Sequence, residues 1–321
     1  MAVSIESLCD RLLAGDRAAL SQALSLVEQG SGDYLTIRRH IRHAVEGKVV
    51  LGVTGPPGAG KSSLVNVLTQ EWRARGYRVA IIAVDPSSPI SGGALLGDRV
   101  RMSAALDDDG VFVRSLSSSG TVGGLAPAVV RLLELFDAAG FDRLIIETVG
   151  AGQSEIDVAA VADIKLVVSA PGLGDGIQAI KSGLLEIADV LVVNKSDLPG
   201  ADATAEQLRN AVSLRGYEDG FVPVVLTSAS STAGIIELAD VADELLVLRS
   251  SHSREERMRQ RLLYMIEQAA KELLNQKLHQ AESSTKVSSI VNALAAGDID
   301  PRTAALEIMR DTLAESECLN D

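Results

Sequence analysis

Aromatic side chains are scarce in this chain of 321 residues: they make up 3%, whereas hydrophobic residues make up 46%. We therefore expect a substantial core that is built mainly from aliphatic side chains. Cysteine is nearly absent, and the two cysteines, Cys9 and Cys318, lie at opposite ends of the chain. Their number and spacing argue against a disulfide framework or a thiolate metal cluster, and they fit a reducing compartment.

Positive charge is also in short supply. The chain has 30 Lys and Arg residues against 43 Asp and Glu residues, a formal net charge of -13. Nucleic acids and anionic membranes require a basic surface, so we expect neither as a partner. No apolar run approaches the length of a membrane span, and the first residues, MAVSIESLCD, lack the basic stretch that opens a signal peptide. These absences together predict a cytoplasmic protein.

Hydrophobic periodicity divides the chain into three regions. Leucines recur at helical spacing between residues 5 and 42, which predicts an N-terminal helical extension over residues 1–46. In residues 47–250, short apolar runs alternate with helical stretches, and this alternation predicts an α/β domain whose mostly parallel sheet carries helices on both faces. Its site should lie at the carboxyl ends of the strands. The seven runs are VVLGVT, RVAIIAVD, VFVRSL, RLIIET, IKLVVSA, VLVVNK and VPVVLTSA.

A third pattern begins at the charged segment of residues 249–261. A long amphipathic helix with a short heptad-like stripe is predicted there, followed by two more helices, in a C-terminal arm over residues 251–321. We interpret the stripe as the contact surface of a homodimer; the alternative is that it docks on the core of its own chain. The stripe consists of Leu262, Ile266, Ala269 and Leu273.

The segment VVLGVTGPPGAGKSSLVNVL has the pattern of a strand, a G-x-x-x-x-G-K-S loop and a helix. Glycines in such a loop let backbone N–H groups surround phosphate oxygens, and the helix N-terminus points at the anion. Lys61 is expected to bridge the β- and γ-phosphates, and the Ser62 hydroxyl to hold Mg²⁺. A chance glycine-rich turn is disfavoured because strand, loop and helix follow in register, so we predict a P-loop NTPase. Its predicted nucleotide-binding residues are Gly55, Pro56, Pro57, Gly58, Ala59, Gly60, Lys61, Ser62 and Ser63.

The segment DVLVVNKSDLPG indicates which base is bound. Asn194, Lys195 and Asp197 form N-K-x-D at the end of a buried strand, the pattern with which GTPases read guanine. A carboxylate accepts hydrogen bonds from both the ring N–H and the exocyclic amino group of guanine, whereas adenine offers no such pair. Downstream of a phosphate loop, this pattern favours GTP over ATP; a simple strand-ending turn is the alternative. The next strand should be followed by a second base-contacting loop, made of Ser228, Ala229 and Ser230.

Three acids between the two motifs are candidates for the Mg²⁺ site, together with Ser62. Asp85 and Glu147 end predicted strands, and Asp98 opens a predicted helix. Mg²⁺ takes octahedral oxygen ligands and usually keeps several waters. Nucleotide switches commonly have Asp at the position of Glu147, and the longer Glu side chain is expected to contact the ion through a water molecule. Alternatively, Asp98 caps a helix and Asp85 is a turn acid before a proline.

Two glycine-rich loops carry further catalytic candidates. Gln153 in VGAGQSE is expected to reach toward the attacking water, and a solvent-facing loop amide is the alternative. Lys181 lies in APGLGDGIQAIKSG, which is expected to order against a partner or a nucleotide state; a flexible surface loop is the alternative. The predicted catalytic residues are thus Lys61, Glu147, Gln153 and Lys181.

Taken in order, GPPGAGKSS, DPSSP, GDRVRM, ETVGAGQSE, PGLGDGIQAIKSG and VVNKSDL closely resemble the motifs of the methylmalonyl-CoA mutase-associated GTPases, the MeaB or ArgK-like family. The resemblance covers nearly the whole chain. It implies a P-loop GTPase of the SIMIBI class that hydrolyses GTP to GDP and phosphate with Mg²⁺, forms homodimers and chaperones an adenosylcobalamin-dependent acyl-CoA mutase. Such a chaperone gates cofactor loading and protects the mutase, so adenosylcobalamin would be involved only through the partner.

The resemblance also carries residue roles. It implies that Asp85, Asp98 and Glu147 belong to the Mg²⁺ site, and that residues 175–181 form an additional switch that senses the mutase. One departure from the family pattern is Ala151, where relatives usually carry valine.

Two other functions share the phosphate loop. A nickel metallochaperone GTPase needs clustered cysteine and histidine, and the four His and two Cys of this chain are not clustered. A P-loop small-molecule kinase needs a basic lid over its substrate and leaves N-K-x-D unexplained. The sequence does not name the client among methylmalonyl-CoA, isobutyryl-CoA and 2-hydroxyisobutyryl-CoA mutases.

Overall fold

The chain divides into two compact units, Met1–Met265 and Ile266–Asp321. The computed structural model describes residues 4–28, 32–85, 108–117, 125–148, 160–172, 184–213, 222–250, 254–281 and 285–317. In that part of the chain, no helix is both long enough and apolar enough to cross a membrane. The elements in chain order are α1 (Ile5–Leu13), α2 (Arg17–Glu28), α3 (Tyr34–Ile41), β1 (Val50–Thr54), α4 (Lys61–Ala74), β2 (Val79–Asp85), β3 (Val111–Ser117), α7 (Leu125–Ala138), β4 (Arg143–Thr148), β5 (Ile164–Ser169), α10 (Leu184–Ile187), β6 (Val190–Val193), α11 (Ala201–Ser213), β7 (Val224–Leu226), α12 (Ile235–Ser250), α13 (Arg254–Ala281), α14 (Thr285–Ala296) and α15 (Pro301–Glu317).

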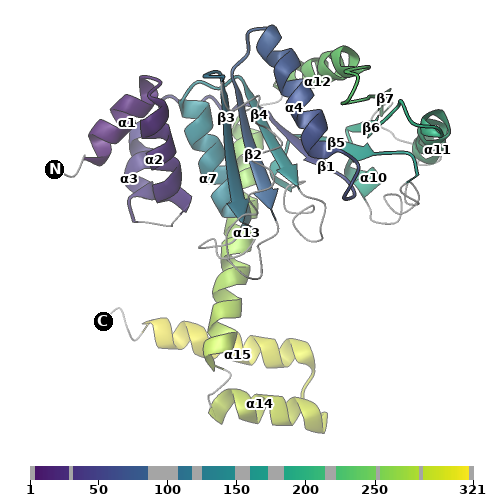
Figure 1. The fold of residues 1–321 in the computed structure, drawn as a ribbon. Coiled ribbons are helices and arrows are strands. Elements are labelled where there is room, and N and C mark those ends of the chain that lie inside the picture. Colours follow the sequence, from purple (N-terminus) through teal and green to yellow (C-terminus); the bar gives the residue numbers. More distant parts are fainter. Residues whose placement is uncertain are drawn as a thin grey trace. The chain divides into compact units, whose positions relative to one another are not determined.

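Among the described residues, seven parallel strands form one sheet in the order β3-β2-β4-β1-β5-β6-β7 (Figure 1). Each of the seven apolar runs in the sequence contributes one strand, which confirms the predicted α/β fold. β1 is central, and its Val53 aligns with Glu147 of β4 and with Leu166 of β5. β2, β3 and β4 lie on one side of β1, and the later strands β5, β6 and β7 lie on the other side. The carboxyl end of β1 therefore lies where the strand order reverses, which is where such sheets bind ligands.

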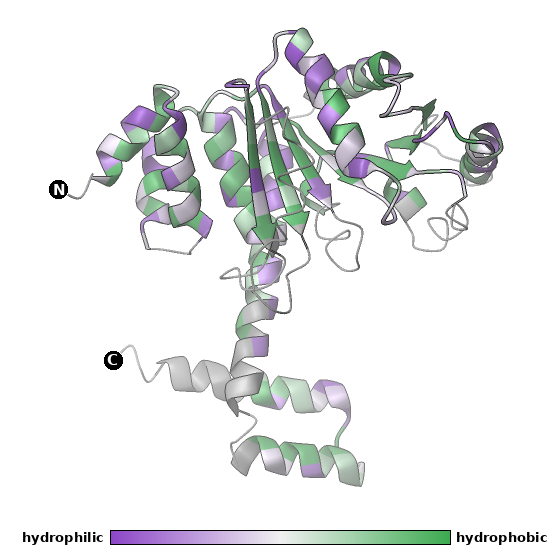
Figure 2. Ribbon diagram, viewed as in Figure 1, coloured by the Kyte–Doolittle hydropathy of each residue, from purple (hydrophilic) through white to green (hydrophobic). Residues whose placement is uncertain are grey.

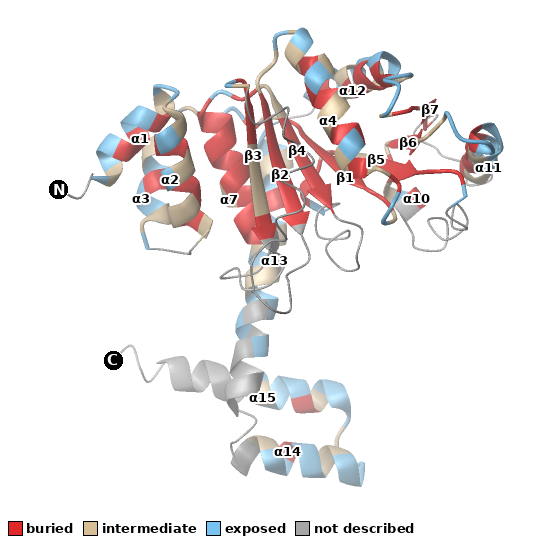
Figure 3. Ribbon diagram, in the orientation of Figure 1, coloured by how far each residue is buried: buried red, intermediate tan, exposed pale blue. Residues whose placement is uncertain are grey.

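The strands are buried on both faces, as their hydropathy and burial show in Figures 2 and 3. Successive side chains of a strand point to opposite faces, so one strand supplies two cores. In β4, Leu144 and Ile146 join one core, whereas Ile145 joins the other. Strands in this position carry apolar residues continuously instead of alternating them with polar ones, which is the pattern seen in the sequence.

Helices cover both faces of the sheet. α4 and α12 pack on one face, where Leu64, Leu68 and Leu238 are fully buried. α7 packs on the opposite face together with α1, α2 and α3, and α10 and α11 cover the part of that face near β6 and β7. The N-terminal helices therefore share one hydrophobic core with the sheet.

The few aromatic residues are concentrated inside the first unit. Phe112, Phe136 and Phe141 pack together with ring centroids 5.5 to 6.4 Å apart. Trp72 is fully buried, and its Nε1 donates to Asp243 of α12 at 3.1 Å. The core is otherwise aliphatic, in line with the composition.

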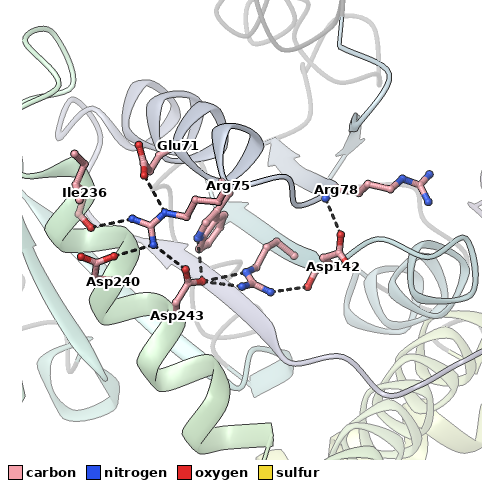
Figure 4. A network of polar contacts seen from close by, with 9 residues as sticks. Glu71, Arg75, Arg78, Asp142, Ile236, Asp240 and Asp243 are labelled. Carbon is pink, nitrogen blue, oxygen red and sulfur yellow. Dashed lines mark hydrogen bonds and ion pairs between the residues drawn. The ribbon is translucent and has the colours of Figure 1, made fainter.

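A polar network ties α4 to α12 and to the start of β4 (Figure 4). Asp243 of α12 accepts from Arg75, the C-cap residue of α4, at 3.0 Å and from Arg143 of β4 at 2.9 Å. Arg75 also contacts Glu71 on its own helix and Asp240 on α12. These contacts fix the C-terminal end of α4, whose N-terminal end carries the phosphate loop.

Arginines on one side of α13 fasten its first turns to the amino ends of two central strands. Arg257 donates to the Gly47 carbonyl at 2.8 Å. Arg261 is buried and pairs with Asp163, which precedes β5, and the Asp163 carboxylate also accepts the Val50 N–H of β1 at 2.7 Å. The beginning of α13 is therefore part of the first unit.

The second unit consists of the remainder of α13 with α14 and α15. Ile290 of α14 and Ala304 of α15 are buried. Leu273, Val291 and Leu306 are exposed large hydrophobic residues in the same unit. The homodimer that the sequence suggests remains a prediction.

Candidate functional site

The phosphate loop connects the carboxyl end of β1 to the first residue of α4. Its shape requires glycine at two positions. Gly55 has φ +142°, and a Cβ there would lie 2.0 Å from the Val168 carbonyl oxygen. Gly60 has φ +87°, and a Cβ there would lie 2.5 Å from the Asn194 side-chain nitrogen. Both backbone shape and lack of space therefore exclude larger residues. All nine predicted phosphate-loop residues lie in this turn and the first turn of α4.

The Lys61 side chain is held against its own loop. It is 5% exposed, and its Nζ donates to the carbonyl oxygens of Gly55 at 2.6 Å and Pro56 at 3.0 Å. A charged amine at the N-terminus of α4 and at the centre of a glycine-rich loop is positioned to neutralise phosphate charge.

Ser62 and Glu147 meet beside this loop. Glu147 is the last residue but one of β4, next to β1, and is 2% exposed. The Ser62 hydroxyl donates to its Oε1 at 2.5 Å. A hydroxyl and a carboxylate are the oxygen donors that Mg²⁺ prefers, so these two side chains fit such an ion. In the described ranges there is no group of three or more His, Cys, Asp and Glu side chains that could hold a metal.

Of the other acids predicted for the metal site, Asp85 is at the end of a described strand. Asp85 is the last residue of β2, and its neighbour two positions earlier, Ala83, pairs with Glu147. The backbone of Asp85 therefore lies at the same edge of the sheet as Glu147. Asp98, Gln153 and Lys181 lie outside the described residues, as does the switch predicted at 175–181.

Asn194 connects the phosphate loop to the base-reading loops. It is 1% exposed, and its side-chain nitrogen donates to the Ala59 carbonyl at 2.9 Å. Its Oδ1 accepts the Ala229 N–H at 3.2 Å and the Thr227 hydroxyl at 3.3 Å. Lys195 has the left-handed φ of +59°, and its Nζ donates to the Gly58 carbonyl at 2.7 Å. Three segments that are far apart in the sequence are thus held together by two neighbouring side chains.

Asp197 is oriented by serines of the second loop. The Ser228 hydroxyl donates to Asp197 Oδ1 at 2.5 Å and lies 2.9 Å from the Ser230 hydroxyl. The hydrogen bond from Ser228 is the largest cause that lowers the pKa of the Asp197 carboxyl, followed by a backbone hydrogen bond of Asp197 itself. The carboxylate is therefore kept ionised and ready to accept hydrogen bonds.

Sequence reasoning placed Ser228, Ala229 and Ser230 at the base but missed how they act on each other. In the structure the Ala229 N–H donates to Asn194 and the Ser228 hydroxyl donates to Asp197. The missing information was that β6 and β7 are neighbours. The backbone N–H of Thr227, the residue after β7, donates to the Val193 carbonyl of β6 at 2.8 Å.

A parallel sheet whose central strand leads through G-x-x-x-x-G-K-S into a helix defines a P-loop nucleotide-binding protein. The comparisons with known proteins are more specific. The sequence profile of the methylmalonyl Co-A mutase-associated GTPase MeaB family matches residues 20–283. The chain belongs to this family, which confirms the resemblance seen in its motifs.

Individual relatives and a solved structure agree with the family match. A putative GTPase of Pyrococcus abyssi is 40% identical over 314 residues, 96% of this chain and 97% of the relative. The mitochondrial methylmalonic aciduria type A homolog of Mus musculus is 35% identical over 259 residues, 75% of this chain and 62% of the relative. The crystal structure of an LAO/AO transport system kinase superposes with a TM-score of 0.74 at 26% identity, covering 98% of this chain and 100% of that one. The chain is a GTPase that binds guanine nucleotides.

Proposed function

We propose that this GTPase is a chaperone of an adenosylcobalamin-dependent acyl-CoA mutase, and that its nucleotide cycle gates cofactor loading and protects the mutase. The family match over residues 20–283 carries this proposal, because the family is described by its association with methylmalonyl Co-A mutase. The similarity to a mouse protein named for methylmalonic aciduria points the same way. Adenosylcobalamin is involved only through the partner.

In this proposal, separate segments of the chain bind the phosphates and the base of GTP. The loop from Gly55 to Ser63 surrounds the phosphates with N–H groups, and Lys61 neutralises the β- and γ-phosphates. Asp197 accepts from the two guanine donors, while the stem of Lys195 lies over the base. Support comes from the contacts of Asn194 and Lys195 with the loop, which bring the base reader and the phosphate cradle to one place.

Ser62 and Glu147 would hold Mg²⁺ between them, with Glu147 acting through a water. The ion would screen the charge that develops on the phosphates. Their contact of 2.5 Å and the burial of Glu147 support this assignment. Asp85 and Asp98 complete the proposed set of acids. Gln153 would orient the attacking water, and Lys181 would respond to the mutase.

The test is GTP turnover with and without purified methylmalonyl-CoA mutase. No arginine occurs in the phosphate loop or in ETVGAGQSE, so intrinsic hydrolysis should be slow, because an arginine finger is worth roughly 10³–10⁵ in rate where it exists. We expect a clear rise in turnover with mutase, lost in Lys181→Ala while GTP affinity stays unchanged. If none of the methylmalonyl-CoA, isobutyryl-CoA and 2-hydroxyisobutyryl-CoA mutases changes the rate of GTP turnover, the proposal is contradicted.

A kinase is the second candidate, because the solved structure at TM-score 0.74 is that of an LAO/AO transport system kinase. Phosphoryl transfer to a small acceptor, such as an amino acid, would need a binding site beside the γ-phosphate. The two functions separate in one assay. With radiolabelled γ-phosphate, a kinase passes the label to the added amino acid, whereas a GTPase releases it as inorganic phosphate.

The remaining parts of the proposal concern assembly and location. We propose a cytoplasmic homodimer in which residues 251–321 form the dimerisation arm, residues 47–250 the GTPase domain and residues 1–46 a helical extension. Exposed apolar residues on α13, α14 and α15 support the dimer, because water-exposed patches of this kind favour association.

A further inference from the structure

The outer side of α3 carries positive charge in a chain that is rich in acids. Leu35, Arg39, Arg42 and His43 are exposed, and Leu35 is 58% exposed. Their spacing of four, three and one residues places them on one side of the helix and of the turn that continues it. No acid occurs between residues 34 and 45. We call these four residues the α3 basic face.

The two arginines of this face are not paired within the part of the chain that the structure describes. Arg38 and His40, on the same helix, are paired with carboxylates of α7 and α1. In contrast, the side chains of Arg39 and Arg42 make no ion pair or hydrogen bond with any residue that the structure describes. A chain with 13 excess negative charges thus leaves two arginines and an exposed leucine side by side in water.

The inner side of α3 is held rigidly. Ile37 and Ile41 are buried against the core. Glu134 of α7 is 6% exposed and accepts from Arg38 at 3.1 and 3.2 Å and from the Tyr34 hydroxyl at 3.1 Å. Burial also raises the pKa of the Tyr34 hydroxyl, which therefore stays a donor. A helix fixed in this way has its backbone already in place, so that binding has to order only the exposed side chains.

We propose that the α3 basic face is a docking surface for a protein that presents carboxylates around an apolar contact. The exposed Leu35 supplies the apolar centre, and Arg39 and Arg42 supply charged hydrogen bonds at its rim, which is the usual anatomy of a protein interface. Duplex DNA and anionic membranes fit less well. Both take their affinity from many cations at once, and this face has two arginines in a chain of net charge -13.

The partner class rests on the proposed function, since the mutase is the client that would carry these carboxylates. The experiment measures association and dissociation rates of immobilised methylmalonyl-CoA mutase with the full-length GTPase at several salt concentrations. The variants are Arg39→Gln with Arg42→Gln, and Leu35→Ser. The matched control is Arg209→Gln with Arg259→Gln, which removes the same charge from exposed positions on α11 and α13.

Charge at the rim of an interface acts mainly on association, so the Arg39 and Arg42 double variant should associate about tenfold more slowly and depend less on salt. Leu35→Ser should dissociate faster, because it removes apolar contact. The control pair should match the parent protein in both rates. None of these residues belongs to the nucleotide site, so basal GTP turnover should be unchanged in every variant.

Association of the double variant at the parental rate overturns the α3 basic face as a docking surface and leaves the mutase as client. If the parent protein does not bind the mutase, the proposed function fails, and a peptide of alternating Glu and Leu decides the surface separately. Binding of that peptide by the parent and not by the double variant supports the surface; absence of binding overturns it. If anionic vesicles or duplex DNA bind the parent protein and not the double variant, the surface is a membrane-binding or DNA-binding site and the protein partner is overturned.

Discussion

Replacing Asn194 by alanine tests whether one buried amide holds the nucleotide site together. Asn194 is 1% exposed and donates to the Ala59 carbonyl of the phosphate loop at 2.9 Å. It accepts the Ala229 N–H of the second base loop at 3.2 Å. Asn194→Ala removes both hydrogen bonds, and with them the longer one that the buried Thr227 hydroxyl donates to Asn194 at 3.3 Å.

The expected cost follows from the burial of those two groups. Ala59 is fully buried, and an unsatisfied buried carbonyl costs about 1–3 kcal/mol. Ala229 is partly exposed, so its N–H can turn to water and its loss counts as one hydrogen bond, about 1 kcal/mol. These two groups alone should lower the free energy of unfolding by about 2–4 kcal/mol, and the Thr227 hydroxyl adds to that loss. A domain that is stable by roughly 5–15 kcal/mol can survive a change of this order. GTP should bind at least about tenfold more weakly, equal to about 1.4 kcal/mol, because both loops shift.

Urea unfolding and titration with a fluorescent GTP analogue measure the two effects. Asn210→Ala is the matched control, since Asn210 is exposed on α11. An exposed substitution normally changes stability by less than about 0.5 kcal/mol. If Asn194→Ala is indistinguishable from this control in both assays, the amide does not link the two loops and the reasoning is refuted.

Four further outcomes are expected. Asp197→Asn should weaken GTP binding strongly and favour xanthosine triphosphate, since each charge-assisted hydrogen bond is worth about 1.5–3 kcal/mol; unchanged GTP affinity would contradict the base assignment. Lys61→Ala should abolish tight triphosphate binding in the same titration, and tight binding would exclude its role at the phosphates. Glu147→Gln should spare GTP binding but lower turnover when Mg²⁺ is limiting; normal turnover across a Mg²⁺ titration would count against the metal site. A chain ending at Met265 should be monomeric by light scattering and still hydrolyse GTP, and a persistent dimer would place the interface elsewhere.

The strands were predictable because a strand buried on both faces leaves a continuous apolar run. RLIIET predicts β4 in this way, and Ile145 and Ile146 indeed enter opposite cores. The phosphate loop was predictable because its residues are contiguous, so their spacing alone defines the turn. Lys61 and Ser62 therefore lie at the start of α4, as the motif requires.

Contacts between motifs were not predictable in the same way. A motif identifies which residue ends a strand, but not which strands are neighbours. Asn194 meets Ala59 across 135 positions, and Ser228 meets Asp197 across 31. These contacts depend on the strand order, which no local pattern contains. Arg261 belongs to the same class, because its ion pair with Asp163 joins residues 98 positions apart and no local pattern in the charged segment indicates that partner.

That ion pair has a consequence for the order of events during synthesis. Asp163 holds the first residue of the central strand, and the arginine that balances its charge is made 98 residues later. At about 5–20 residues per second, the ribosome needs about 5–20 seconds to cover that distance. Until then the Asp163 carboxylate lacks the Arg261 guanidinium. A buried ion pair that lacks one partner is destabilised by about 3–5 kcal/mol. The ability to bind GTP should therefore arise late in translation, when the first turns of α13 leave the exit tunnel.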